Sequence, residues 1–269
     1  MVDAERLDEL VTAVRSVARY RGISEDLVRR VGAQELGKRS NLKEAIKSTR
    51  SKLHQVGGAY LEAGPDFDTW QEKLAALPSC PTDPVMQEFC HQAMTQHAST
   101  RERLPILEEF FGQTLASLGP IHSVLDLACG LNPLALAWMP VADDVVYHAC
   151  DIYEDMLAFV GGFLDHCGVQ QHVSVCDLSI ECPSLPVQVV FLLKTIPCLE
   201  QLDKTVGPRL LDSIVAEHLL VSFPVRSLGG RAKGMEQNYE NHFHQLVAGR
   251  GWQIKRFQFR TELAFLVSR

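Results

Sequence analysis

The sequence of 269 residues lacks several features that would each assign it to a large class of proteins. No apolar run approaches the roughly 20 residues needed to span a bilayer, and no charged-then-apolar signal segment stands at the start of the sequence. The eight cysteines include no Cys-x-x-Cys pair, and the ten histidines show no zinc-ligand spacing. We therefore expect a cytoplasmic protein with reduced, mostly buried thiols, no structural metal ion and no membrane partner. We also expect it to be a monomer.

The charges are separated by sign along the chain. The formal net charge is −7, but residues 13–54 hold eleven lysines and arginines against four acidic residues, a local charge of +7 that leaves −14 for the rest. A basic segment joined to an acidic body is expected of a protein that contacts a nucleic-acid phosphate backbone. A basic helix face that is simply solvated is the alternative, and charge alone leaves both open.

Two kinds of hydrophobic periodicity divide the chain. From residue 3 to about residue 118, apolar residues recur at spacings of three and four, which predicts helices. After Pro120, short β-rich apolar runs alternate with helical stretches, which predicts a parallel sheet covered on both faces. We expect a basic helical domain over residues 1–104 and an α/β domain over 105–269. The predicted strands are 122–128, 145–152, 172–178, 187–193, 219–225, 252–260 and 262–268, and the last two are close enough to form an antiparallel hairpin.

A turn of small residues follows the first predicted strand, in the sequence VLDLACG at 124–130. In doubly wound sheets the ligand lies beyond the carboxyl ends of the strands, and small residues such as Ala128 and Gly130 let it approach the backbone. Twenty-one residues after Gly130 the second strand ends at Asp151, where a carboxylate accepts both ribose hydroxyls of an adenosine cofactor. The third strand ends at Asp177 and Leu178, a position suited to the adenine ring.

The acidic residues Asp126, Asp151 and Asp177 at three strand ends favour S-adenosylmethionine (SAM) as the cofactor. A nicotinamide dinucleotide is the competing ligand, but the sequence after Gly130 lacks the second and third glycines that admit a pyrophosphate. SAM has no phosphate, so it does not need them. We therefore predict the seven-stranded, Rossmann-like sheet of a class I SAM-dependent methyltransferase with an N-terminal helical domain. A non-catalytic sheet with chance acidic residues is the alternative.

Three longer motifs extend beyond the cofactor turn: HASTRER at 97–103, DLACGLNPLA at 126–135 and SFPVRSLGGRAKGME at 222–236. With VRR at 28–30 and KLHQVGGAY at 52–60, they closely resemble the aminoglycoside-resistance 16S rRNA methyltransferases that act on N7 of guanine 1405. The resemblance extends over nearly the whole chain.

The resemblance implies a set of cofactor-binding residues. His97, Ala98, Ser99 and Arg103 match the family's segment at the entrance of the SAM pocket, where the arginine binds the SAM carboxylate with two parallel donors. Tyr60 stands where some relatives have phenylalanine. The other positions that line the family's pocket are Tyr60, Ala128, Asp151, Asp177, Leu178, Leu193 and Gln201, to which the turn adds Gly130.

The resemblance also implies the reaction and the partner. Guanine N7 has an in-plane lone pair and loses no proton, so no residue is expected to act as a general base, and catalysis comes from alignment and charge stabilisation. The flipped base would be held by the loop after the fifth strand. The partner would be 16S rRNA in the assembled 30S subunit. The residues expected to contact RNA are Arg226, Arg231 and Lys233 in this loop and Arg29, Arg30 and Lys52 in the helical domain.

Two other functions fit these observations. The chain could be a methyltransferase that acts on another RNA base or a small molecule, or a catalytically silent RNA-binding relic of such an enzyme.

Overall fold

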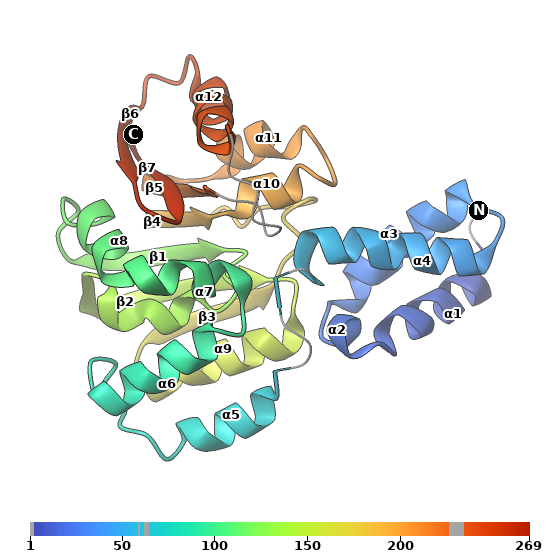
Figure 1. Cartoon of the computed structure of the whole chain (residues 1–269), viewed down its shortest axis with the longest axis horizontal. Helices are drawn as coiled ribbons and strands as arrows, with labels where there is room; N and C mark the ends of the chain where they lie inside the picture. Colours follow the sequence, from blue (N-terminus) through green and yellow to red (C-terminus); the bar gives the residue numbers. More distant parts are fainter. Residues whose placement is uncertain (1–2, 59, 62–64, 226–233) are drawn as a thin grey trace.

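The computed structural model describes residues 3–58, 60–61, 65–225 and 234–269. A central seven-stranded sheet lies between two layers of helices, and a group of N-terminal helices lies beyond the carboxyl ends of its parallel strands (Figure 1). The strand order is β3-β2-β1-β4-β5-β7-β6. The strands are β1 (Ile121–Leu127), β2 (Val141–Asp151), β3 (Gln170–Val175), β4 (Val187–Leu193), β5 (Ala216–Pro224), β6 (Gln253–Gln258) and β7 (Glu262–Ser268).

The pairing of the strands confirms the predicted sheet. The strands β1 to β5 pair in parallel, whereas β7 is antiparallel to both β5 and β6. Each predicted strand overlaps an observed one, and those predicted at 187–193 and 262–268 coincide with β4 and β7. The ends of the other five strands differ from the predicted ends by one to four residues. β3, for example, stops at Val175 rather than at residue 178, because the Asp177 side chain accepts the N–H of Ser179 at 3.0 Å and turns the chain.

The apolar runs form strands because both faces of the sheet are covered. Along β4, Val189 and Phe191 point into the core on one face, and Val190 and Leu192 point into the core on the other. The first core lies under α6 (Pro84–Met94), α8 (Leu107–Thr114) and α9 (Glu154–His166). The second lies under α10 (Thr195–Leu199), α11 (Val206–Ser213) and α12 (Met235–Val247), at the top of Figure 1.

The N-terminal helices pack on one another. They are α1 (Ala4–Arg15), α2 (Ala18–Arg21), α3 (Glu25–Lys38) and α4 (Leu42–Leu53), and a π-helical turn over His54–Gly58 follows. The apolar stripe that predicted them is buried, with Leu10, Val14 and Val28 fully covered. The side chains of Asp3 and Asn41 cap the first turns of α1 and α4.

The helices between residues 65 and 104 pack against the sheet half of the molecule. Phe67 and Trp70 of α5 (Phe67–Leu74) and Phe89 of α6 surround Phe159 of α9, with ring centroids 5.7, 5.4 and 6.3 Å from that of Phe159. The first four helices are thus the part that stands apart from the sheet in Figure 1. The division of the chain after residue 104 stays a prediction.

Three further features concern membranes, thiols and metals. Over the described ranges, we find no helix with the length and apolar character that crossing a membrane requires. All eight cysteines are free; Cys90, Cys129 and Cys150 are buried, Cys80 is exposed and the other four are partly covered. Fewer thiols are buried than predicted, because most of these four lie in loops or at helix ends. The part of the chain that the structure describes contains no cluster of three His, Cys, Asp or Glu residues placed to hold a metal ion.

Candidate active site

A cavity opens at the carboxyl ends of the parallel strands, where the strand order reverses between β1 and β4. Ligands of doubly wound sheets bind at this point. The empty space in the cavity is about 840 Å³, the solvent at its mouth included. The N-terminal helices form part of its wall through Leu27, Val56 and Gly57, opposite the strand ends. The two halves of the chain therefore share one site.

The turn after β1 brings backbone to the cavity. Ala128 and Gly130 have φ values of 52° and 53°, in the left-handed region where a glycine is not strained. A Cβ atom on Gly130 would lie 2.7 Å from Cε1 of His97, so only glycine fits beside the imidazole. This close approach explains why the turn needs a glycine.

Asp151 ends β2 and is held by the same turn. One carboxylate oxygen accepts the N–H of Gly130 at 2.9 Å, and the other accepts the N–H of Ile152 at 2.6 Å. Burial raises the pKa of Asp151, while these backbone donors oppose the shift. The carboxylate is thus fixed at the cavity wall by backbone, and its binding of the ribose hydroxyls stays a prediction.

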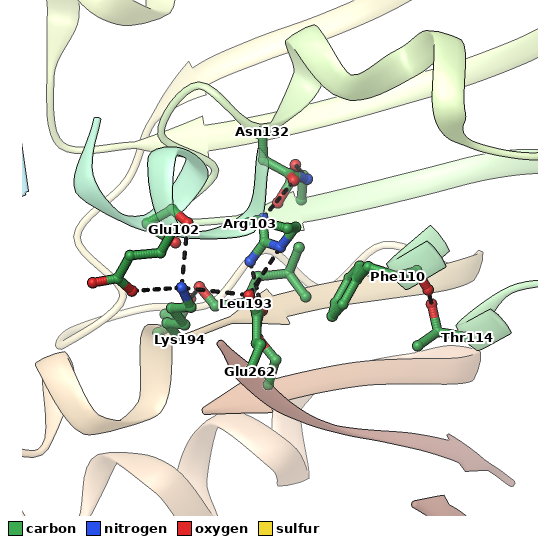
Figure 2. Close-up of polar contacts among 12 residues, drawn as sticks. Glu102, Arg103, Phe110, Thr114, Asn132, Leu193, Lys194 and Glu262 are labelled. Carbon is green, nitrogen blue, oxygen red and sulfur yellow. Dashed lines mark hydrogen bonds and ion pairs between the residues drawn. The ribbon is translucent and has the colours of Figure 1, made fainter. Parts of the chain in front are cut away.

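Arg103, at the end of α7 (Ala98–Arg103), is the centre of a buried polar network (Figure 2). Its Nε and Nη2 donate to the two carboxylate oxygens of Glu262 at 3.2 and 2.7 Å. Nη1 donates to the side-chain oxygen of Asn132 at 2.9 Å, and the Phe110 ring covers the guanidinium at 4.9 Å. Arg103 is only 1% exposed, so these contacts fix its orientation.

Lys194 joins the same network directly after β4 (Figure 2). Its Nζ lies 2.8 Å from a carboxylate oxygen of Glu102 and 3.4 Å from one of Glu262. Burial alone would raise the pKa of Glu262, but Arg103 and Lys194 outweigh it and the pKa lies below its usual 4.5. Glu262 is therefore ionised at neutral pH. Glu262 and Glu102 balance the charges of Arg103 and Lys194. Of these four residues only the two cations line the cavity, which gives its wall a positive region suited to an anionic ligand group.

The network continues to the centre of the sheet. The Asn132 side-chain amide and the Tyr147 hydroxyl each donate to the same oxygen of Asp126 at 2.8 Å. Burial raises the pKa of Asp126 to about 7, and its two donors and Arg103 limit the shift. The bonds run without a break from β1 through Asn132 and Arg103 to β7, so the sheet itself orients the arginine.

His97, Tyr60 and Cys198 form the wall on the side of the N-terminal helices. The rings of His97 and Tyr60 are stacked with centroids 6.3 Å apart, and the Cys198 thiol donates to the Tyr60 hydroxyl at 2.9 Å. Burial, with Lys194 and Arg103 nearby, lowers the pKa of His97 to about 3. The imidazole is therefore neutral at physiological pH.

Most of the residues predicted to bind the cofactor meet at the cavity, although their individual roles stay predictions. Ala98 lies behind the wall, where its N–H donates to the Tyr60 carbonyl at 2.7 Å, and Gly130 contributes its buried backbone. Gln201 is exposed beyond α10, and its neighbours Leu199 and Leu202 line the cavity instead. The predicted residues in the wall are Tyr60, His97, Ser99, Arg103, Ala128, Asp151, Asp177, Leu178 and Leu193.

The sequence analysis missed Lys194, Asn132 and Glu262. Lys194 directly follows the apolar strand β4, and Glu262 begins the apolar strand β7. A charged residue at the end of a buried strand is the pattern that could have identified both. Asn132 stood inside the motif at 126–135 that carries the family resemblance, but no role was predicted for it.

The cations predicted to contact RNA are paired with acidic residues. Arg29 donates to Asp8 at 2.6 Å, and Lys52 lies 2.7 Å from the buried carboxylate of Glu35. Arg30 instead faces the cavity rim, where it pairs with Asp177. The predicted loop residues Arg226, Arg231 and Lys233 lie outside the described residues.

The strand order with its antiparallel end hairpin, the small-residue turn after β1 and the acidic residue at the end of β2 define a class I methyltransferase. A family model described as "Ribosomal RNA methyltransferase (FmrO)" matches residues 15–266. The chain belongs to this family.

Sequence and structure comparisons agree. A 16S rRNA (guanine(1405)-N(7))-methyltransferase of Micromonospora rosea is 35% identical over 265 residues, which cover 98% of this chain and 97% of the relative. The crystal structure of the 16S rRNA methyltransferase RmtF in complex with S-adenosyl-L-homocysteine (SAH) superposes with a TM-score of 0.84 at 33% identity, covering 99% of both chains. The 16S rRNA methylase RmtB superposes with a TM-score of 0.79 at 25% identity, covering 98% of both chains.

Proposed function

We propose that this protein transfers a methyl group from SAM to N7 of guanine 1405 in 16S rRNA and so confers resistance to aminoglycosides such as kanamycin and gentamicin. The observation that carries this proposal is the shared cavity, in a chain of this family, whose wall contains a carboxylate fixed by backbone and two buried cations. Relatives that match nearly the whole chain carry the same activity in their names.

The residues of the cavity fit SAM. Arg103 and Lys194 form the positive region that suits the amino-acid carboxylate of the cofactor. Asp151, which backbone donors hold at the cavity wall, would accept the ribose hydroxyls, and Asp177 and Leu178 in the same wall would contact the adenine. SAM supplies an electrophilic methyl group when it is bound.

The chain has little covalent chemistry to perform. Guanine N7 offers its lone pair without losing a proton, so the protein needs to align the base and exclude water rather than to remove a proton. The neutral imidazole of His97 adds no positive charge beside a cationic cofactor. The Cys198 thiol is protonated at neutral pH, because burial raises its pKa to about 11, so it does not act as a nucleophile.

The basic N-terminal helices supply a surface for RNA. Lys38, Arg39 and Lys52 surround the buried carboxylate of Glu35, which neutralises one of the three charges. With Arg29 on α3, this surface would dock on rRNA phosphates of the assembled 30S subunit. The loop at 226–233 would hold the flipped base. We propose that the enzyme acts as a monomer in the cytoplasm, where its substrate is found.

Methyl transfer by the purified chain tests this proposal. Incubation with SAM carrying a labelled methyl group and 30S subunits is expected to label 16S rRNA at guanine 1405, and the Asp151→Asn variant is expected to label it far more slowly. Label in tRNA or a small molecule but not in 30S subunits would select another methyltransferase activity. RNA binding without any binding of SAH would indicate a silent relic.

A further inference from the structure

Two adjacent arginines of α3 face different parts of the molecule. Arg29 is 38% exposed at its side chain and pairs with Asp8 and Glu25 on the surface of the N-terminal helices. The Arg30 side chain crosses to the loop after β3, where Nε donates to the Asp177 carboxylate at 3.0 Å and Nη2 donates to the Ser179 hydroxyl at 2.7 Å. Both arginines were predicted to contact RNA, but their positions separate them.

The contact of Arg30 lies at the rim of the cofactor cavity. Asp177 and Leu178 line the cavity, and so does Leu27, which is three residues before Arg30 on the same face of α3. One face of the helix thus provides an apolar part of the wall and the cation that holds Asp177. The other oxygen of Asp177 accepts the N–H and hydroxyl of Ser179, so both carboxylate oxygens are fixed.

Backbone contacts keep α3 in this position. The Ser24 N–H donates to the Ile152 carbonyl at 2.8 Å, and the Glu154 N–H donates to the Gly22 carbonyl at 2.7 Å. Both bonds join the start of α3 to the residues that follow Asp151. A Cβ on Gly57 would lie 2.9 Å from side-chain atoms of Ile152 and Tyr153, so the π-helical turn packs against the same segment. The orientation of Arg30 therefore does not depend on its ion pair alone.

We propose that Arg30 is a positioning residue of the cofactor pocket, which orients Asp177 toward the adenine end of SAM, and that it does not serve as an RNA contact. Both arginines are paired, but the partners of Arg29 are exposed carboxylates, 64% for Asp8 and 49% for Glu25, which water can solvate when the arginine turns to a phosphate. Asp177 is only 18% exposed, so Arg30 would leave a half-buried carboxylate without its cation. The inference rests on the proposed function, because it takes SAM as the ligand of the cavity. It also makes the RNA-docking helices part of the cofactor site.

The test compares Arg30→Met with Arg29→Met in the full-length protein, since each change removes one charge from the same helix. Calorimetry with SAH is expected to show affinity lowered about tenfold for Arg30→Met, as when the partner that orients a ligand-binding group is lost, and unchanged affinity for Arg29→Met. Steady-state kinetics are expected to show a raised KM for SAM with an unchanged KM for 30S subunits in Arg30→Met, and the reverse in Arg29→Met. Arg30→Lys, which keeps the charge, is expected to restore part of the SAH affinity.

A double-mutant cycle shows whether Arg30 acts through Asp177. If it does, adding Arg30→Met to Asp177→Asn weakens SAH binding no further than Asp177→Asn alone. The inference is overturned if Arg30→Met binds SAH like the unchanged protein and loses affinity for 30S subunits, or if the two effects on SAH binding simply add. Absence of SAH binding by the unchanged protein would instead overturn the proposed function.

Discussion

Replacing Glu262 with glutamine removes one negative charge from the buried network around Arg103 while keeping the size of the side chain. The Glu262 carboxylate is fully buried and ionised, and it is the bidentate partner of Arg103. Removal of one partner from a buried ion pair destabilises a protein by about 3–5 kcal/mol. Because Lys194 keeps Glu102 as a second partner, we expect the lower end, about 3 kcal/mol.

Thermal unfolding measures this loss. For a chain of this length, 1 kcal/mol shifts the Tm by about 2–4 °C, so Glu262→Gln is expected to lower the Tm by about 6–12 °C. The matched control is Glu236→Gln, because Glu236 pairs with Arg256 at 2.8 Å but both side chains are about one-third exposed, and the expected loss is under about 1 kcal/mol.

Saturating SAH should reduce the difference in Tm between Glu262→Gln and the unchanged protein, because the ligand carboxylate would supply an anion to the two cations. A Tm for Glu262→Gln within about 2 °C of that of Glu236→Gln would refute the reasoning that Glu262 is a required counter-ion. If SAH leaves this difference in Tm unchanged, the cofactor carboxylate does not bind at the positive region.

Three other changes test the remaining parts of the site. Asp151→Asn should weaken SAH binding about 10- to 100-fold by calorimetry, because a charged acceptor of ligand hydrogen bonds is lost; unchanged affinity would place the ribose elsewhere. Gly130→Ala should lower the free energy of unfolding in urea by about 1–3 kcal/mol, because the new methyl meets His97 in a left-handed backbone; no loss would mean that the turn relaxes freely. The depressed pKa of His97, about 3 against 6.5 unfolded, gives stability that is present above pH 6.5 and lost as the pH falls toward 3. Between pH 6.5 and 4.5, the free energy of unfolding should therefore fall by about 2–3 kcal/mol more in the unchanged protein than in His97→Phe. Equal falls in the two proteins would show that the histidine is not buried as a neutral group.

The strands could be predicted because each central strand is a continuous apolar run between polar turns. Their ends were harder to predict. β2 begins at Val141 rather than at residue 145, because a register shift beside Ile121 extends the pairing past the exposed Asp143 and Asp144. Asp177 resembled a strand end, yet its own side chain forms the turn that stops β3 before it.

The cofactor turn and Asp151 could be located from the sequence because their spacing follows from one strand-helix-strand unit. The buried network around Arg103 could not be located in this way. Glu262 meets Arg103 only through the antiparallel pairing of β7 with β5, and the two residues are 159 positions apart. Likewise, charge counting cannot show which cation of α3 faces inward, since Asp177 lies 147 residues beyond Arg30.

Mass spectrometry of 16S rRNA tests the central claim most directly. A susceptible bacterium expressing the chain is compared with one expressing Asp151→Asn at equal protein level. The account predicts 7-methylguanosine at position 1405 and growth on kanamycin and gentamicin with the unchanged chain, and little of either with the variant. An unmodified guanine 1405 in cells that contain the folded protein, with no rise in aminoglycoside tolerance, would contradict it.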